Sequence, residues 1–376
     1  MAKNFADRIR LNYPKTWQAL TDGSLKAEVM AADGAPVMPK FVKELRKMPQ
    51  FKHIEYVHDK GHSFNLLTRD AVNLTTRLAG TTASILTTIS NLVSSSECLK
   101  KLYDLRFEAD KEELDVYFKE YYCEKGEDGE YYDFVRHRHL KIRAKTRFLG
   151  YQIFYQSVTY LYMVTIAAMQ DLAVTGTREQ QGIALGVLRS LRSVDFNFEL
   201  NFNQRYFYHM ANCNRRLQAP GLTKAAAIDA YSNLIKELRS LEQRLPELET
   251  LAKKQTKEVI EKIGDVAVST RHSTRHSDVD NFQVCLFEYV DAIEDTIKLV
   301  KESIDAETAS TDDFILISSM YNETMFSTYT YLKSKYRKEM GETLLFLSMI
   351  GSASPRRLVQ LDTEKLARLF MKNDAD

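Results

Sequence analysis

The densest chemistry in the sequence is a run of basic side chains between residues 136 and 147. These twelve residues hold eight arginines, lysines and histidines, and aromatic residues stand on both sides of them. Cationic side chains bind phosphates and aromatic rings stack on bases, so this mixture is typical of single-stranded nucleic-acid binding. The candidate contact residues in and beside the run are Arg136, Arg138, Lys141, Arg143, Lys145, Arg147 and Tyr151.

The run 136–147 would present its side chains differently in a strand and in a helix. In a strand, His137, His139, Lys141 and the later cations at every second residue point to one face, whereas in a helix they spread around the cylinder. Like charges this close need counter-charges, and the acidic stretch 108–120 could supply them across a hairpin. Three interpretations stay open: internal neutralisation, nucleic-acid binding and contact with an anionic membrane.

Two weaker basic clusters follow along the chain. The first adds the candidate contact residues Arg205, Tyr206, Arg215 and Arg216, and the second lies in residues 271–276. The whole chain is almost neutral, with 52 Lys and Arg against 51 Asp and Glu. Recurring basic patches in a neutral chain imply that charge is segregated, so a groove lined by several of them could hold a polyanion.

No residue pattern indicates an enzyme. The phosphate-binding patterns GxxxxGK[ST] and GxGxxG are absent, and so is the nucleophile pattern GxSxG. His53, His58 and His62 have no cysteine or acidic residue at zinc-ligand spacing. The sequence therefore predicts no catalytic residue, no metal and no cofactor.

The spacing of the cysteines and the first residues of the chain indicate the cellular compartment. All four stand far apart without a CxxC pair, which predicts free thiols in a reducing environment. The first ten residues carry charges and no apolar core, unlike a secretory leader. We expect a cytoplasmic protein, with leaderless export as the alternative.

Composition and periodicity predict a mainly α fold. Of 376 residues, 44% are hydrophobic and 27% charged, as in ordinary globular proteins, while only 14 Gly and 7 Pro disfavour an all-β architecture. The uncharged runs 78–96 and 148–170 are expected to be core helices. Helices are predicted over residues 64–107, 148–170, 222–263, 279–306, 311–350 and 359–371.

Two segments predict a minor β element. Residues 194–202 alternate strictly between apolar and polar side chains, a period of two that indicates a half-buried strand. Residues 114–143 hold two β-prone runs around Gly126 and Gly129, which indicates a hairpin. Residues 269–278 lack apolar side chains and are expected to form an exposed loop.

The prolines suggest the domain organisation. Four of the seven fall within the first 49 residues and none falls between residues 50 and 219. Proline breaks helices and central strands, and Pro246 is expected to kink or restart a helix within a leucine seam. The predicted parts are an irregular N-terminal arm (1–49), an α-rich lobe with the minor β element (50–219), a helical lobe (220–351) and a C-terminal helical tail (352–376).

The N-terminal arm holds the only tryptophan. Tyr13, Trp17 and Leu20 could fold back on the arm's own core or anchor it on a neighbouring copy of the chain. We expect the second arrangement, because terminal segments exchanged head to tail build rings or filaments. Deleting residues 1–39 should then leave a folded monomer or small oligomer.

Two helical lobes with an arm, a tail and basic–aromatic patches resemble the plan of negative-strand RNA virus nucleoproteins, although no motif carries this likeness. The leading hypothesis is a non-enzymatic, self-assembling protein, a homo-oligomer that binds single-stranded nucleic acid. One alternative is a membrane-active, pore-forming-like helical protein, suggested by the uncharged runs. Another is a filament or scaffold subunit without a ligand, because every basic cluster could be internally paired.

Overall fold

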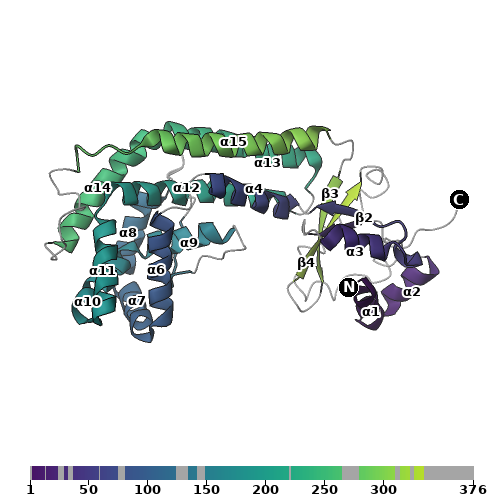
Figure 1. Ribbon diagram of the computed structural model, residues 1–376, viewed down its shortest axis with the longest axis horizontal. Helices are drawn as coiled ribbons and strands as arrows, with labels where there is room; N and C mark the ends of the chain where they lie inside the picture. Colours follow the sequence, from purple (N-terminus) through teal and green to yellow (C-terminus); the bar gives the residue numbers. More distant parts are fainter. Residues whose placement is uncertain are drawn as a thin grey trace. The chain divides into compact units, whose positions relative to one another are not determined.

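A computed structural model shows the fold (Figure 1). It describes residues 2–12, 14–23, 29–32, 37–58, 60–74, 81–123, 134–141, 149–219, 222–264, 279–309, 314–321 and 326–333. Fourteen α-helices lie within these residues, so the predicted mainly α fold is confirmed. The chain divides into two compact units: unit 1 is 1–66, 214–232 and 302–376, and unit 2 is 67–213 and 233–301.

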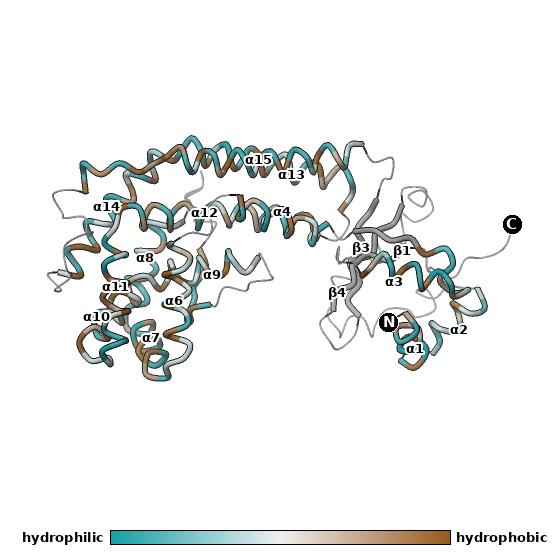
Figure 2. Tube along the Cα trace, viewed as in Figure 1, coloured by the Kyte–Doolittle hydropathy of each residue, from teal (hydrophilic) through white to brown (hydrophobic). Residues whose placement is uncertain are grey.

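Unit 2 is a helical bundle. It contains α6 (Thr81–Ser95), α7 (Glu97–Ala109), α8 (Lys111–Tyr122), α9 (Leu149–Tyr160), α10 (Tyr162–Thr175), α11 (Arg178–Leu191) and α14 (Leu245–Ile263), and parts of α4 (Lys60–Leu74), α12 (Val194–Leu217), α13 (Lys224–Gln243) and α15 (Leu286–Ala309). Apolar and polar residues alternate along helices α13 and α15 in Figure 2, as expected of helices with one buried face. Helix α14 begins anew with Pro246 in its first turn, which is one of the two outcomes that the sequence left open.

Residues 194–202 form the first turns of α12, so the predicted strand is wrong. Three of the four polar members of the alternating pattern are buried as deeply as the apolar ones, with Asn197 and Asn201 fully buried and Glu199 4% exposed, while Asp195 is partly buried. A half-buried strand would expose its polar face to water. The pattern instead belongs to a helix enclosed on all sides.

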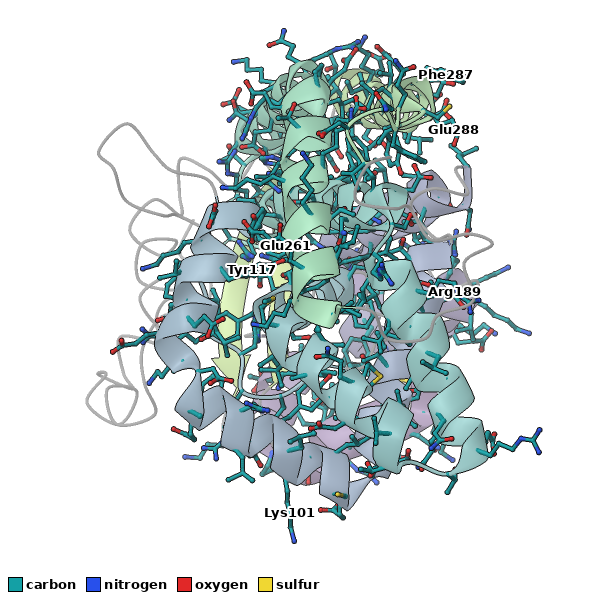
Figure 3. The ribbon with its side chains drawn as sticks, turned by 90° about the vertical axis from the view of Figure 1, so that its left-hand side faces the viewer. Lys101, Tyr117, Arg189, Glu261, Phe287 and Glu288 are labelled. Atoms are coloured by element: carbon teal, nitrogen blue, oxygen red, sulfur yellow. The ribbon has the colours of Figure 1, made fainter. Side chains whose placement is uncertain are left out.

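Two buried amides of the enclosed helix α12, Asn197 and Asn201, find partners on neighbouring helices, whereas Asn203 and Gln204 are buried without a hydrogen-bond partner among the described residues. The Asn197 Oδ1 accepts a hydrogen bond from the Tyr162 hydroxyl at 2.6 Å, and the Asn201 Nδ2 donates to the Gln255 Oε1 at 2.8 Å. The Gln255 Nε2 in turn donates to the Tyr117 hydroxyl at 3.0 Å. Figure 3 shows Tyr117 on α8 beside α14, the helix that carries Gln255. Paired in this way, buried polar groups avoid most of their desolvation cost.

The predicted hairpin over 114–143 is also replaced by a helix in its first part. Leu114, Tyr117, Phe118 and Tyr121 recur at the three- and four-residue spacing of a helix and are all buried in α8. Several of these side chains have high strand propensity, which obscured the helical spacing in the sequence. Intrinsic propensity is weak compared with tertiary packing, and the packing here favours the helix. Residues 124–133 and 142–148 lie outside the described residues, and the described part between them, 134–141, is not a strand.

The uncharged run 148–170 forms two core helices in place of one. Helices α9 and α10 meet at Leu161 with a bend of 66°, and seven side chains of α10 are buried. Within the described residues no single helix is long and apolar enough to cross a membrane, and only this bent pair reaches the threshold when taken together.

Unit 1 combines short helices with two small sheets. Its own elements are α1 (Ala2–Asn12), α2 (Pro14–Asp22), α3 (Val37–Leu45), the 3-10 turn η1 (Pro49–Phe51), β1 (Val29–Ala32), β2 (Glu55–His58), β3 (Phe314–Tyr321) and β4 (Phe326–Lys333). Strands β1 and β2 pair in parallel, with Val29 opposite Glu55, and β3 and β4 pair antiparallel, with Phe314 opposite Lys333.

The C-terminal prediction is wrong in part. A helix was expected over 311–350, yet residues 314–321 and 326–333 are paired strands. The segments are rich in Ile, Thr, Tyr and Phe, whose branched and aromatic side chains suit a pleated sheet. The predicted tail 352–376 and the predicted loop 269–278 lie outside the described residues.

The N-terminal arm is helical where the sequence predicted an irregular chain. Pro14 is the first residue of α2, a position where the missing N–H of proline costs nothing. The helix ends at Asp22, and Gly23 follows with a φ of 83°, which favours glycine. Proline and glycine therefore mark the two ends of a helix here.

The arm packs against its own chain. Trp17 is partly buried, with its ring centroid 6.4 Å from that of Phe51, and Leu20 is 8% exposed in the same apolar cluster as Phe41 and Leu45. Of the three proposed assembly residues, Trp17 and Leu20 thus fill the core of unit 1, and Tyr13 lies outside the described residues. This is the folded-back arrangement that the sequence left open.

We expect the Leu20→Ala variant to destabilise unit 1, because it empties a packed position of the apolar cluster. The loss should be about 2–5 kcal/mol in the free energy of unfolding, measured by urea denaturation. Leu11, 73% exposed on α1, provides the control in the same arm. Leu11→Ala should change stability by less than about 0.5 kcal/mol. An unchanged unfolding midpoint for Leu20→Ala, with a loss of assembly, would instead mean that the arm docks on another copy.

Candidate nucleic-acid interface

The described part of the basic run forms an irregular segment between α8 and α9, which we call the basic strap (residues 134–141). Phe134, His137 and Leu140 are partly buried, and the five residues between and after them are exposed. The inward side chains therefore recur every third residue, which neither a strand nor a helix predicts. Two of every three side chains point outward, and among them are Arg136, Arg138 and Lys141.

The arginines of the basic strap pair with carboxylates of α7 and α8. The Arg136 Nε lies 3.1 and 3.0 Å from the two carboxylate oxygens of Asp115. The Arg138 guanidinium lies 2.9 Å from Asp104 and 3.4 Å from Glu108. The internal neutralisation that the sequence left open thus occurs for these two cations, with helices supplying the acids and no hairpin involved.

The pKa values of these groups follow from their pairing. Burial alone would raise the pKa of the Asp115 carboxyl, but hydrogen bonds from Arg136 and Tyr160 outweigh burial and lower it. The same hydrogen bond raises the pKa of Arg136, and the bond to Asp104 raises that of Arg138. All of these groups therefore stay charged at neutral pH.

His137 is the titratable side chain that faces inward from the basic strap. Burial and, less strongly, the charge of Lys141 lower its pKa from 6.5 to about 4, although a hydrogen bond with Gln156 opposes the shift. Its ring centroid lies 6.5 Å from that of Tyr160. His137 is thus neutral at pH 7 and behaves as part of the packing beneath the strap.

Contacts at both ends fasten the basic strap to the bundle. The Phe134 ring lies 6.1 Å from Phe118 of α8, and the Lys119 ammonium lies 4.6 Å above it. At the other end the Lys141 backbone N–H donates to the Ser157 Oγ of α9 at 3.0 Å. The strap is therefore held in place by α8 and α9, the helices that carry Asp115 and its hydrogen-bond donor Tyr160.

Three of the candidate contact residues lie in the core of unit 2. Tyr151 is 5% exposed and stacks on Phe207, with ring centroids 4.8 Å apart. Arg205 is 3% exposed and donates to Asn201 and to the Tyr121 carbonyl, and Tyr206 is fully buried. These side chains stabilise the bundle and do not reach the surface that carries the strap cations.

The remaining candidates are placed only in part. Arg215 and Arg216 are exposed in the last turn of α12 and belong to unit 1, whereas the basic strap belongs to unit 2. Arg143, Lys145 and Arg147 lie outside the described residues, as does the cluster 271–276. The structure therefore brings together Arg136, Arg138 and Lys141.

Sequence reasoning missed one of the three partners of the strap arginines. The acidic stretch 108–120 contains Glu108 and Asp115 but not Asp104, which pairs with Arg138. The available signal was the four-residue spacing of Asp104 and Glu108, which places both carboxylates on one face of a helix. Within the described residues, no group of three His, Cys, Asp or Glu side chains could hold a metal ion.

Comparisons with known proteins identify no relative. No protein-family model, no curated protein and no solved structure matches the chain. Any functional argument therefore starts from the chain's own residues, and the basic strap is the feature that carries it.

Lowering the pH from 7 to 4 should loosen the basic strap through His137. Between the unfolded pKa of 6.5 and the folded pKa of about 4, the unfolded state binds a proton that the folded state does not. The stability contributed by neutral His137 is fully present above this window and falls as the pH drops through it. Hydrogen exchange of the strap amides measures the change.

The two strap histidines make a matched comparison for this pH dependence. His137→Gln should flatten the pH dependence of strap protection, because the substituted side chain does not titrate. His139→Gln changes a side chain that is 56% exposed and lies 3.7 Å from Asp104, so it tests the surface contact separately from the buried ring of His137. Equal profiles for both variants and the wild type would show that His137 does not couple the strap to pH.

Proposed function

We propose that this protein is a non-enzymatic, self-assembling protein that binds single-stranded nucleic acid along the basic strap. The observation that carries the proposal is the outward orientation of Arg136, Arg138 and Lys141 on an irregular surface segment. The sequence continues this segment directly into Arg143, Lys145 and Arg147. A series of cations along the sequence suits a flexible polyanion better than a compact anion.

The charge balance leaves room for such a ligand. Residues 136–147 hold six Lys and Arg, and the carboxylates that pair with the described strap arginines are Asp104, Glu108 and Asp115. The three strap cations Arg136, Arg138 and Lys141 thus face three carboxylates, and the surplus of positive charge in residues 136–147 over these carboxylates comes from Arg143, Lys145 and Arg147. Release of counterions from the nucleic acid would drive binding, and binding would weaken steeply with salt.

Phosphate contacts replace base stacking in this proposal. Tyr151 and Tyr206 are buried, and the Phe134 ring is partly buried between Phe118 and Lys119. A single strand of nucleic acid lying on the described strap would thus find guanidinium and ammonium groups, and the exposed ring in the strap is the imidazole of His139, which is 56% exposed. We expect little preference among bases, because phosphate contacts carry no sequence information.

Self-assembly is the second part of the proposal. Large apolar side chains protrude from several helices, among them Leu105 (69% exposed), Val174 (79%) and Phe287 (67%). Figure 3 shows Phe287 at the edge of the molecule near the start of α15. Contacts between copies would cover such side chains, and we propose a homo-oligomer that works in the cytoplasm.

The membrane-active alternative has one observation in its favour, the bent pair of α9 and α10. Seven side chains of α10, including Tyr162 and Met169, are however buried within unit 2. Insertion would expose the polar groups that α12 shares with α10, such as the Asn197–Tyr162 hydrogen bond. We therefore prefer the nucleic-acid function and treat membrane activity and a ligand-free scaffold as outcomes of its test.

The proposal predicts salt-dependent binding that needs the strap cations. Fluorescence anisotropy with a labelled 20-nucleotide oligo(U) should show weaker binding as salt rises. The triple variant Lys141→Gln, Arg143→Gln, Lys145→Gln should bind more weakly, and the slope of log K against log salt should fall by about 2, at about 0.7 per lost contact.

A charge-matched variant provides the control. Lys236, Lys298 and Lys301 are exposed on α13 and α15, and changing all three to Gln alters the net charge equally. This variant should bind nearly as the wild type does. Equal losses in both triple variants would mean a general charge effect, and absence of binding by the wild type would favour a scaffold or, if liposomes leak, a membrane-active protein.

A further inference from the structure

The two arginine–carboxylate pairs of the basic strap differ in how deeply they are buried. The Asp115 side chain is 11% exposed and also accepts a hydrogen bond from the Tyr160 hydroxyl at 2.7 Å, so its pair with Arg136 is part of the packed bundle. The Arg138 side chain is 54% exposed, and its partners Asp104 and Glu108 are 35% and 59% exposed. The second pair is therefore accessible to a competing anion.

Asp104 and Glu108 present two negative charges one helical turn apart on α7. Carboxylates and phosphates are bound by arginine through the same charge-assisted hydrogen bonds. Exposed ion pairs contribute little to stability. A phosphate group could thus replace these carboxylates at Arg138 without disturbing the fold.

We infer that Asp104 and Glu108 compete with nucleic-acid phosphates for Arg138, so that α7 restrains the affinity of the basic strap. This inference rests on the proposed function and names its regulation. Arg136 fixes the strap in place through Asp115, while Arg138 exchanges its carboxylates for a phosphate. The free energy of binding a nucleic-acid strand then includes the cost of displacing these two carboxylates from Arg138.

The test removes the competing charges and keeps the shape of the side chains. The double variant Asp104→Asn, Glu108→Gln should bind labelled oligo(U) severalfold more tightly than the wild type at low salt. The slope of log K against log salt should steepen by about 0.7, the value for one additional phosphate contact on a single strand. Adding Arg138→Gln to this double variant should abolish the gain.

The control carries the same change of charge away from the strap. Asp291 on α15 and Glu179 on α11 are both exposed, and the variant Asp291→Asn, Glu179→Gln also raises the net charge by two. Thermal unfolding of all variants should match the wild type, because every changed side chain lies at the surface.

The outcomes separate this inference from the proposed function. If the wild type binds and both double variants bind alike, competition by α7 is disproved while nucleic-acid binding stands. If only the Asp104→Asn, Glu108→Gln variant gains affinity, the inference holds. If no form of the protein binds oligo(U), both proposals fail together.

Discussion

Helix α12 is enclosed by its neighbours, and the hydrogen bonds that this burial demands organise the rest of unit 2. Asn197, Asn201 and Arg205 are buried on one helix, and each needs partners that water cannot supply. Helices α8, α10 and α14 provide them through Tyr121, Tyr162 and Gln255. An unpaired amide at any of these positions would cost about 1–3 kcal/mol. At these three positions the polar side chains therefore favour α8, α10 and α14 as neighbours of α12, whereas Asn203 and Gln204 are buried without a hydrogen-bond partner in the described part of the chain.

The same constraint explains why the sequence misleads between residues 194 and 202. Strict alternation is informative only when the polar side chains face water, and here Asn197 and Glu199 are buried. Single-sequence patterns record which residues are polar but not whether a neighbouring helix will satisfy them. The same reasoning applies to Arg205 and Tyr206, which have the composition of a binding patch and the environment of a core.

Other elements could be predicted because their determinants are local. Pro246 lies in the first turn of a helix, and the uncharged run 148–170 becomes core helices. The density of basic residues correctly draws attention to the segment before α9, but it does not reveal which carboxylates lie opposite. That arrangement depends on the packing of α7 and α8, and the relevant acid Asp104 is 34 residues away from Arg138.

The position of the basic strap is thus a consequence of the core. Tyr160 stands among aromatic side chains that include Phe107 and Phe118, and its hydroxyl donates to Asp115. Asp115 in turn orients Arg136 on the surface. A mutation in this aromatic cluster would displace a surface cation without touching it. The interface and the fold therefore share residues, so a cation such as Arg138, held only by exposed carboxylates, is freer to change partners than Arg136.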